Sequence, residues 1–99
     1  MQNLNYRESI YKQAFIKFGE NSQIACAIEE MSELNVELCK LLNGKQEFNN
    51  PDHLAKLIDE LADVSIMLEQ IQYQWKLRNL VTDRVLIKIE RLRTRIMDE

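Results

Sequence analysis

Two stretches of the chain repeat one pattern: AIEEMSEL at residues 27–34 and LIDELADV at residues 57–64. Each reads apolar, apolar, acid, acid, apolar, small, acid, apolar. The apolar positions recur at helical rather than alternating spacing, which predicts a helix for both copies. At about 100° of turn per residue, the second and third acids of each copy share one face of their helix.

These paired acids lie beside the apolar stripe of each helix, whereas acids that only aid solubility prefer the opposite side. If the helices pack through their stripes, the carboxylates converge at the edge of the core. Like charges ~4 Å apart repel by about 4 kcal/mol at a surface-like dielectric, so such a cluster needs protons or a cation. The pattern therefore predicts a site for Mg²⁺, with Mn²⁺ as a second possible ion, whose ligands are Glu30, Glu33, Glu60 and Asp63. The alternative is that these acids are solvated side chains of two amphipathic helices.

The size and composition of the chain favour one helical domain spanning residues 1–99. Apolar residues make up 45% of the 99 residues and charged residues 29%, which is ordinary for a globular protein. Only two glycines and one proline interrupt the sequence, so long helices are favoured over strands. We predict an all-α fold, a four-helix bundle in which two central antiparallel helices carry the acidic pattern.

Charge and hydropathy narrow the expected location and partners. No apolar run approaches the ~20 residues of a membrane span, and the N-terminus lacks the apolar core of a signal peptide. These features predict a cytoplasmic protein with no membrane partner. The net charge of −3 argues against general binding to nucleic acid polymers. Cys26, Cys39 and the single His53 do not form a zinc-binding pattern, so we expect both cysteines to be reduced packing residues.

Start and stop signals divide the chain into four expected helices, at about residues 4–18, 23–42, 51–77 and 81–97. Gly19 suits the end of the first helix, and Asn21 or Ser22 suits the cap of the second. Asn50 followed by Pro51 is a strong start signal for the third. On that helix Ile66 and Tyr73 fall outside the core stripe, which favours a partner surface and a homo-oligomer.

The last expected helix carries two adjacent stripes after a break at Arg78 and Asn79. Its expected core side consists of Val85, Ile89, Leu92 and Ile96. A basic stripe with spacings of four, three and four residues lies beside it and consists of Arg84, Lys88, Arg91 and Arg95. Basic residues complement the helix dipole only in the last turns, so this effect does not explain a stripe that begins at Arg84.

An acidic cluster and a basic stripe together predict a site for a metal-bound polyanion, in which Lys88, Arg91 and Arg95 hold phosphate oxygens. Such a site suits attack of water on a phosphoryl or nucleotidyl group. Glu29 is the expected general base for this water, and Asp59 is the corresponding acid of the second copy. The sequence has no glycine-rich phosphate loop and no Ser/His or Cys/His arrangement for covalent catalysis. It also lacks the ExxH pairs of carboxylate-bridged di-iron bundles.

The pattern Glu29-Glu30-x-x-Glu33, a spacer, and Glu60-x-x-Asp63 resembles the signature of the MazG-like, all-α nucleoside triphosphate pyrophosphohydrolases. The stretches around it, and Lys88-Ile89-Glu90-Arg91-Leu92, resemble the small MazG-like proteins of Gram-positive bacteria and their phages. The resemblance covers roughly residues 10–95.

This resemblance implies a helical fold, assembled as a homodimer or homotetramer, that hydrolyses a nucleoside triphosphate to the monophosphate and pyrophosphate with Mg²⁺. It implies metal binding by the four paired acids, orientation or deprotonation of water by Glu29, and a phosphate contact by Lys88. Relatives often carry asparagine or tyrosine near the C-terminal basic residues, where this chain reads RLRTRI at residues 91–96. The second hypothesis is a non-catalytic helical interaction module that retains the fold.

Overall fold

The computed structural model describes residues 2–98, which form four α-helices joined by short connections. The helices are α1 (Leu4–Phe18), α2 (Glu20–Leu42), α3 (Pro51–Gln74) and α4 (Arg78–Asp98). No strand occurs among residues 2–98, so the prediction of an all-α fold with four helices is confirmed. None of the described helices is long and apolar enough to cross a membrane.

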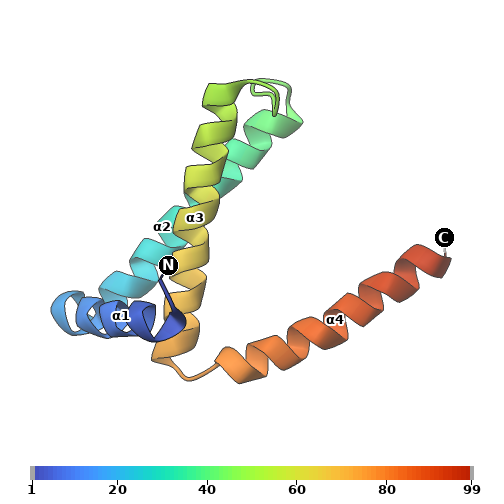
Figure 1. The fold of residues 1–99 in the computed structure, drawn as a ribbon. Coiled ribbons are helices and arrows are strands. Elements are labelled where there is room, and N and C mark those ends of the chain that lie inside the picture. The colour runs from blue at the N-terminus through green and yellow to red at the C-terminus, as the bar shows by residue number, and fades with distance from the viewer. Residues whose placement is uncertain (1, 99) are drawn as a thin grey trace.

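The centre of the molecule is an antiparallel hairpin of α2 and α3, and α1 packs across its open end (Figure 1). The helix α4 contacts only α3 among the described helices and extends away from the other three. The two copies of the acidic pattern therefore lie on the two helices of the hairpin. This arrangement places them side by side at the middle of its length.

Caps at the helix ends explain most of the boundaries. The Asn50 side chain accepts hydrogen bonds from the backbone N–H groups of Asp52 and His53, at 3.0 and 3.2 Å, so the predicted start of α3 is confirmed. Gly19 has a φ of +87° and ends α1, as the sequence predicts. The helix α2 begins at Glu20, directly after this glycine. The expectation that Asn21 or Ser22 caps α2 is therefore wrong.

The helices α2 and α3 both end in Schellman motifs, in which a residue with positive φ lets two backbone N–H groups bond back into the helix. At the end of α2 this residue is Gly44, with a φ of +75°, and the N–H of Lys45 donates to the carbonyl of Lys40. At the end of α3 it is Lys76, with a φ of +56°, and the N–H of Leu77 donates to the carbonyl of Gln72. Because lysine rarely takes this conformation, no stop signal for α3 can be read at this point of the sequence.

The expected end of α3 at residue 77 and break at Arg78 and Asn79 are therefore wrong. The break lies at residues 75–77, and Arg78 is the first residue of α4. Trp75 is the C-cap of α3.

The core of a single chain is small. Its buried apolar side chains are those of Tyr11, Ala27, Leu57 and Val64. Gln23 and Gln70 are also buried and form a hydrogen bond with each other between α2 and α3. At the end of the hairpin covered by α1, the Glu69 carboxylate accepts hydrogen bonds from Arg7 Nε at 2.6 Å and from the Tyr11 hydroxyl at 2.8 Å.

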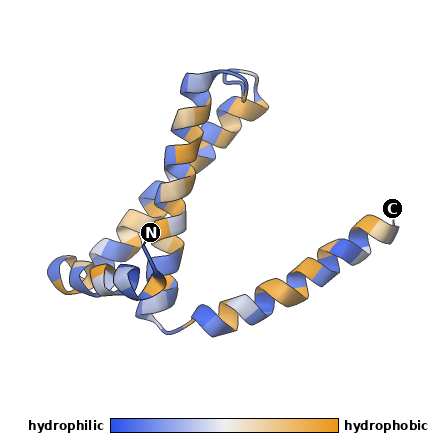
Figure 2. Cartoon of the chain, in the orientation of Figure 1, coloured by the Kyte–Doolittle hydropathy of each residue, from blue (hydrophilic) through white to orange (hydrophobic). Residues whose placement is uncertain are grey.

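Much of the predicted core stripe is exposed. On α4 the expected core side of Val85, Ile89, Leu92 and Ile96 is between 43 and 65% exposed, and no residue of the helix is buried. Hydropathy colouring shows apolar and polar residues alternating along the whole uncovered length of α4 (Figure 2). The prediction that this side of α4 enters the core of its own chain is wrong, because α4 turns away from α2 after residues 75–77.

Two smaller predictions on packing are also corrected. Cys39 is exposed, so it does not pack in the interior, whereas Cys26 is half-buried; both are free thiols. On α3 Ile66 is exposed as expected for an outer position. Tyr73 is half-buried, and its ring lies 6.4 Å from that of Tyr11 on α1.

Candidate metal centre

The packing of α2 against α3 brings three carboxylates together. Ala27 of α2 and Leu57 and Val64 of α3 are buried, so the acidic pattern of each helix lies at the edge of this contact. One oxygen each of Glu30, Glu60 and Asp63 lies within 4.8 Å of the other two. We call these three residues the carboxylate cluster. They are three of the four metal ligands that the sequence predicts.

The carboxylate cluster is shielded on its inner side and open on its outer side. Glu30 and Glu60 are half-buried, whereas Asp63 is exposed. The Oε2 atoms of Glu30 and Glu60 are inaccessible to solvent and have no hydrogen-bond partner among the described residues. A buried acceptor without a donor is unfavourable, and a carboxylate oxygen more so when it is ionised. A cation in the cluster would give both atoms a partner.

Burial and mutual repulsion shift the proton affinity of the cluster. Burial raises the pKa of Glu30 above its usual value of 4.5, and the charges of Glu33 and Asp63 raise it further. Burial likewise raises the pKa of Glu60, with the charges of Glu33 and Asp63 as the next causes. The ionised cluster is therefore destabilised by its own charge, which is the condition that a bound cation relieves.

The other predicted acids lie around the cluster rather than in it. Glu33 is exposed and lies outside the group of three, although its charge raises the pKa of both half-buried glutamates. Glu29, the expected base, is exposed on α2 and does not belong to the cluster. Asp59 is exposed in the same way on α3.

A buried ion-pair group centred on Glu37 lies near the cluster, and it was not predicted from the sequence. Glu37 is only 3% exposed and accepts from Lys56 Nζ at 3.1 Å and Lys40 Nζ at 3.4 Å. Burial acts to raise the pKa of Glu37, but the hydrogen bonds and charges of the two lysines outweigh it and lower the pKa. Half of this signal was present in the sequence, because Lys40 lies three residues after Glu37 on the same helix. The contact with Lys56 joins two helices, so residue spacing does not predict it.

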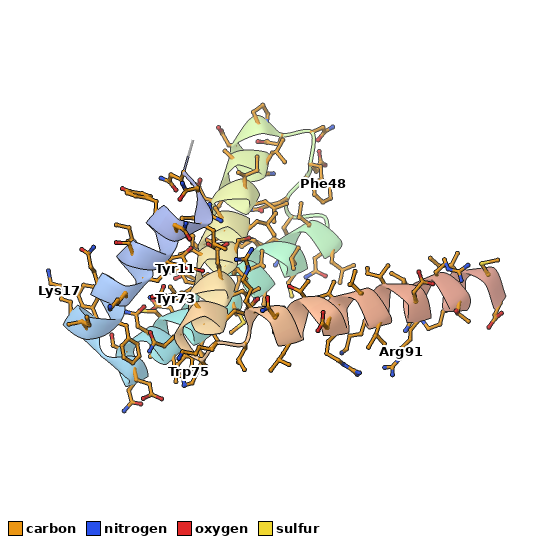
Figure 3. The ribbon with its side chains drawn as sticks, turned by 60° about the horizontal axis from the view of Figure 1, so that its bottom comes forward. Tyr11, Lys17, Phe48, Tyr73, Trp75 and Arg91 are labelled. Carbon is orange, nitrogen blue, oxygen red and sulfur yellow. The ribbon has the colours of Figure 1, made fainter. Side chains whose placement is uncertain are left out.

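The predicted phosphate-binding residues are not brought to the cluster within one chain. Lys88, Arg91 and Arg95 are exposed on α4. The side chain of Arg91 lies far along α4, away from Tyr73 at the lower end of α3 (Figure 3). The basic stripe and the carboxylate cluster are therefore separate surfaces of the chain.

Several aromatic residues lie at the α1 end of the hairpin. Trp75 packs edge-on against Phe15, with ring centroids 6.5 Å apart. Phe18 is exposed beneath Lys17, whose Nζ lies 5.5 Å from the ring centre. A groove of about 570 Å³ opens beside Phe15 and Tyr73, and no residue of the carboxylate cluster lines it.

Comparison of the sequence and the structure with known proteins gives no match among family models, curated proteins or solved structures.

Proposed function

We propose that the chain is a Mg²⁺-dependent hydrolase of the MazG-like type, which converts a nucleoside triphosphate to the monophosphate and pyrophosphate. The proposal is carried by one observation: three carboxylates whose oxygens lie within 4.8 Å of one another, two of them with a shielded oxygen lacking a partner. Carboxylate oxygens are the ligands that Mg²⁺ prefers, and Mg²⁺ commonly shares its coordination shell with substrate phosphates. The residues present fit such an ion.

Each acid has a proposed role. The carboxylate cluster would hold the ion, and Glu33, one turn from Glu30, would be the fourth ligand after rotation of its side chain. When bound, the ion would offset phosphate charge and lower the pKa of water. Glu29 would accept the proton of the attacking water, because it is solvent-exposed and adjacent to Glu30 in the sequence. Asp59 is the alternative base on α3.

The remaining phosphate charge would be held by the basic stripe of α4, chiefly by Lys88, with Arg91 and Arg95 beyond it. Since these residues are remote from the cluster in one chain, the proposal includes a homo-oligomer, either a dimer or a tetramer. We place this enzyme in the cytoplasm, where nucleoside triphosphates are abundant and where it would limit unwanted nucleotides.

The test is product analysis with a panel of canonical and modified ribo- and deoxyribonucleoside triphosphates in Mg²⁺ or Mn²⁺. We expect the monophosphate and pyrophosphate in equal amounts, and loss of both in Glu60→Gln. Glu47→Gln, which removes one acid from the exposed loop after α2, is the matched control and should keep the activity. No turnover by folded protein, or release of the diphosphate and single phosphate, would contradict the proposal.

A non-catalytic interaction module is the second candidate, and the wholly exposed apolar side of α4 favours it. The two candidates differ in their response to ligand. A ligand at a hundred times its Kd adds about 2.7 kcal/mol to the free energy of unfolding. Under the catalytic proposal, Mg²⁺ with a non-hydrolysable nucleotide raises the melting temperature by several degrees, whereas a module without a metal site shows no rise.

A further inference from the structure

The helix α4 is uncovered along its length. One side of it is formed by Val85, Ile89, Leu92 and Ile96, which are between 43 and 65% exposed, and the helix has no buried residue. Helices in proteins owe most of their stability to packing of an apolar face, and contiguous exposed apolar surface marks an interaction site. The apolar side of α4 therefore has a partner that one chain does not supply.

Charge identifies what kind of partner this is. The helix α4 contains six basic and three acidic residues, whereas α2 and α3 together contain ten acidic and two basic residues. Within one chain α4 contacts α3 but not α2, and it then extends away from the hairpin, so most of its basic residues do not face these acids (Figure 1). A second copy offers the surface that the first copy lacks, and the exchange is reciprocal, as a twofold interface requires.

The apolar surfaces and the lengths also match. The hairpin exposes apolar side chains beside its acids, among them Ile28 and Met31 on α2 and Ile58 and Leu61 on α3, at 41 to 58%. At 1.5 Å per residue α4 is about 30 Å long and each helix of the hairpin about 35 Å, so α4 spans most of the hairpin. Its apolar and basic stripes are adjacent, as are the apolar residues and acids of the hairpin.

We infer that α4 of one copy docks along the acidic face of α2 and α3 of a second copy, which places Lys88 and Arg91 beside the partner's carboxylate cluster. The protein is then a dimer with two composite sites, each with its acids from one chain and its basic residues from the other. The docking is inferred from the exposed apolar side chains and from the opposite charges of α4 and the hairpin alone. Only the statement that the basic residues hold substrate phosphate in trans rests on the proposed function.

The first test is the oligomeric state by sedimentation equilibrium. Wild-type chain should be dimeric, and Ile89→Glu, which places a carboxylate in the apolar stripe, should weaken the dimer about thirtyfold or more. The control is Thr94→Glu, which adds the same charge on the opposite side of α4 and should leave the dimer intact. Circular dichroism separates dissociation from unfolding, because Ile89 is 55% exposed on a helix without buried residues, so the substitution leaves the core of its own chain unchanged. A monomeric wild type, or a dimer unaffected by Ile89→Glu, overturns the inference.

The second test locates α4 without using activity. In a background of Cys26→Ala and Cys39→Ser, a chain with Ala62→Cys is mixed with a chain with Lys88→Cys and treated with a short bis-maleimide. We expect a cross-linked pair of one chain of each kind, and little product when Thr94→Cys replaces Lys88→Cys. Equal cross-linking by both α4 variants overturns the docking geometry. Binding of a single-stranded oligonucleotide by a monomeric wild type would instead assign α4 to nucleic acid.

The third test uses activity and is read only if the wild type hydrolyses a nucleotide. Glu60→Gln is mixed in equal amounts with the double variant Lys88→Ala/Arg91→Ala, each inactive alone. Random dimers with composite sites regain about a quarter of wild-type activity, because half of the dimers have one complete site. No recovery, with mixed dimers formed, overturns the assignment in trans. An inactive wild type that passes the first two tests contradicts the proposed hydrolysis and leaves the docking in place.

Discussion

At the scale of single residues, Glu30 and Glu60 are the side chains whose surroundings disfavour their ionised form. Both are half-buried in a group of like charges, and each has a shielded oxygen without a partner. Residues in such a position lower the stability of the metal-free fold, and natural proteins keep such conflicts chiefly at functional sites. Substitutions here should therefore change stability and ligand binding in opposite directions.

Glu60→Gln should raise the melting temperature of the metal-free protein, because it removes one charge from the carboxylate cluster without changing its shape. The same substitution should weaken Mg²⁺ binding by at least about tenfold, which is the lower end of the loss caused by removing even a supporting hydrogen bond at a metal site. Thermal unfolding in EDTA and isothermal titration with Mg²⁺ measure the two effects. Asp52→Asn, at the exposed start of α3, is the control. A lower melting temperature for Glu60→Gln in EDTA would contradict the cluster's repulsion.

The pH dependence of stability should carry the signature of the raised pKa values of Glu30 and Glu60. The pKa of each of these carboxyls is higher in the folded protein than in the unfolded chain, where it is near 4.5. Such a group contributes its full stabilisation below the unfolded pKa, and this stabilisation is lost as the pH rises through the folded pKa. Stability in EDTA should thus fall from pH 4.5 upwards, and saturating Mg²⁺ should reduce the fall. Denaturant titrations across this range give the slope. The double variant Glu30→Gln/Glu60→Gln should lose it, and an unchanged slope would assign the effect to other groups.

At the scale of helices, the ends of α2 and α3 show where sequence reading succeeds and where it fails. Asn50 followed by Pro51 predicts the start of α3, because an asparagine cap and a proline at the first helical position are both typical of a helix N-terminus. The end of α3 could not be predicted, because Lys76 occupies a left-handed position that usually holds glycine. Helix type and the acidic pattern were readable from periodicity, but the direction of α4 depends on this one backbone conformation.

Lys76→Gly should stabilise the protein by about 0.5–1 kcal/mol, since it relieves the unfavourable conformation of a side-chain-bearing residue at positive φ. Gly44→Ala, at the equivalent place after α2, should destabilise it by about 1 kcal/mol. No atom lies within 4 Å of a Cβ built at Gly44, so only the backbone conformation opposes alanine there. Chemical denaturation of both variants is the measurement. The same sign of change in both would refute this explanation of the helix ends.

The buried pair of Gln23 and Gln70 joins α2 to α3. Gln23→Ala should cost about 1–3 kcal/mol, because it leaves the Gln70 amide buried without its partner. For a chain of this size each kcal/mol lowers the melting temperature by about 4–8 °C. Replacing both residues by leucine should be nearly neutral, because no buried polar group is then left unpaired. A double variant as unstable as Gln23→Ala would show that packing, rather than hydrogen bonding, dominates.

At the scale of the whole molecule, the charge of the chain is divided between its parts, acidic in the hairpin and basic in α4. Composition and net charge could not predict this division, although the two stripes could be read from their spacing. The sequence also identified the apolar side of α4, but not that it lies outside the core of its own chain. Helical periodicity shows which residues share a side of a helix and does not show what covers that side.

The melting temperature should rise with protein concentration, because the dimer that we propose would be stabilised by mass action. Scanning calorimetry over a hundredfold range of concentration should show this rise for the wild type and for Thr94→Glu. Ile89→Glu should show a concentration-independent melting temperature at or below the lowest wild-type value. A wild-type melting temperature that does not vary with concentration would mean that the fold is stable without pairing of α4 with a second copy.

The turn at residues 75–77 makes α4 a lever arm. Because the helix is about 30 Å long, a rotation of about 10° at Lys76 sweeps its far end through roughly 5 Å, which is about one helical turn. The position of the basic stripe is thus set by a backbone angle at a residue far from it. A substitution at residues 75–77 would therefore move the basic stripe without changing any of its side chains.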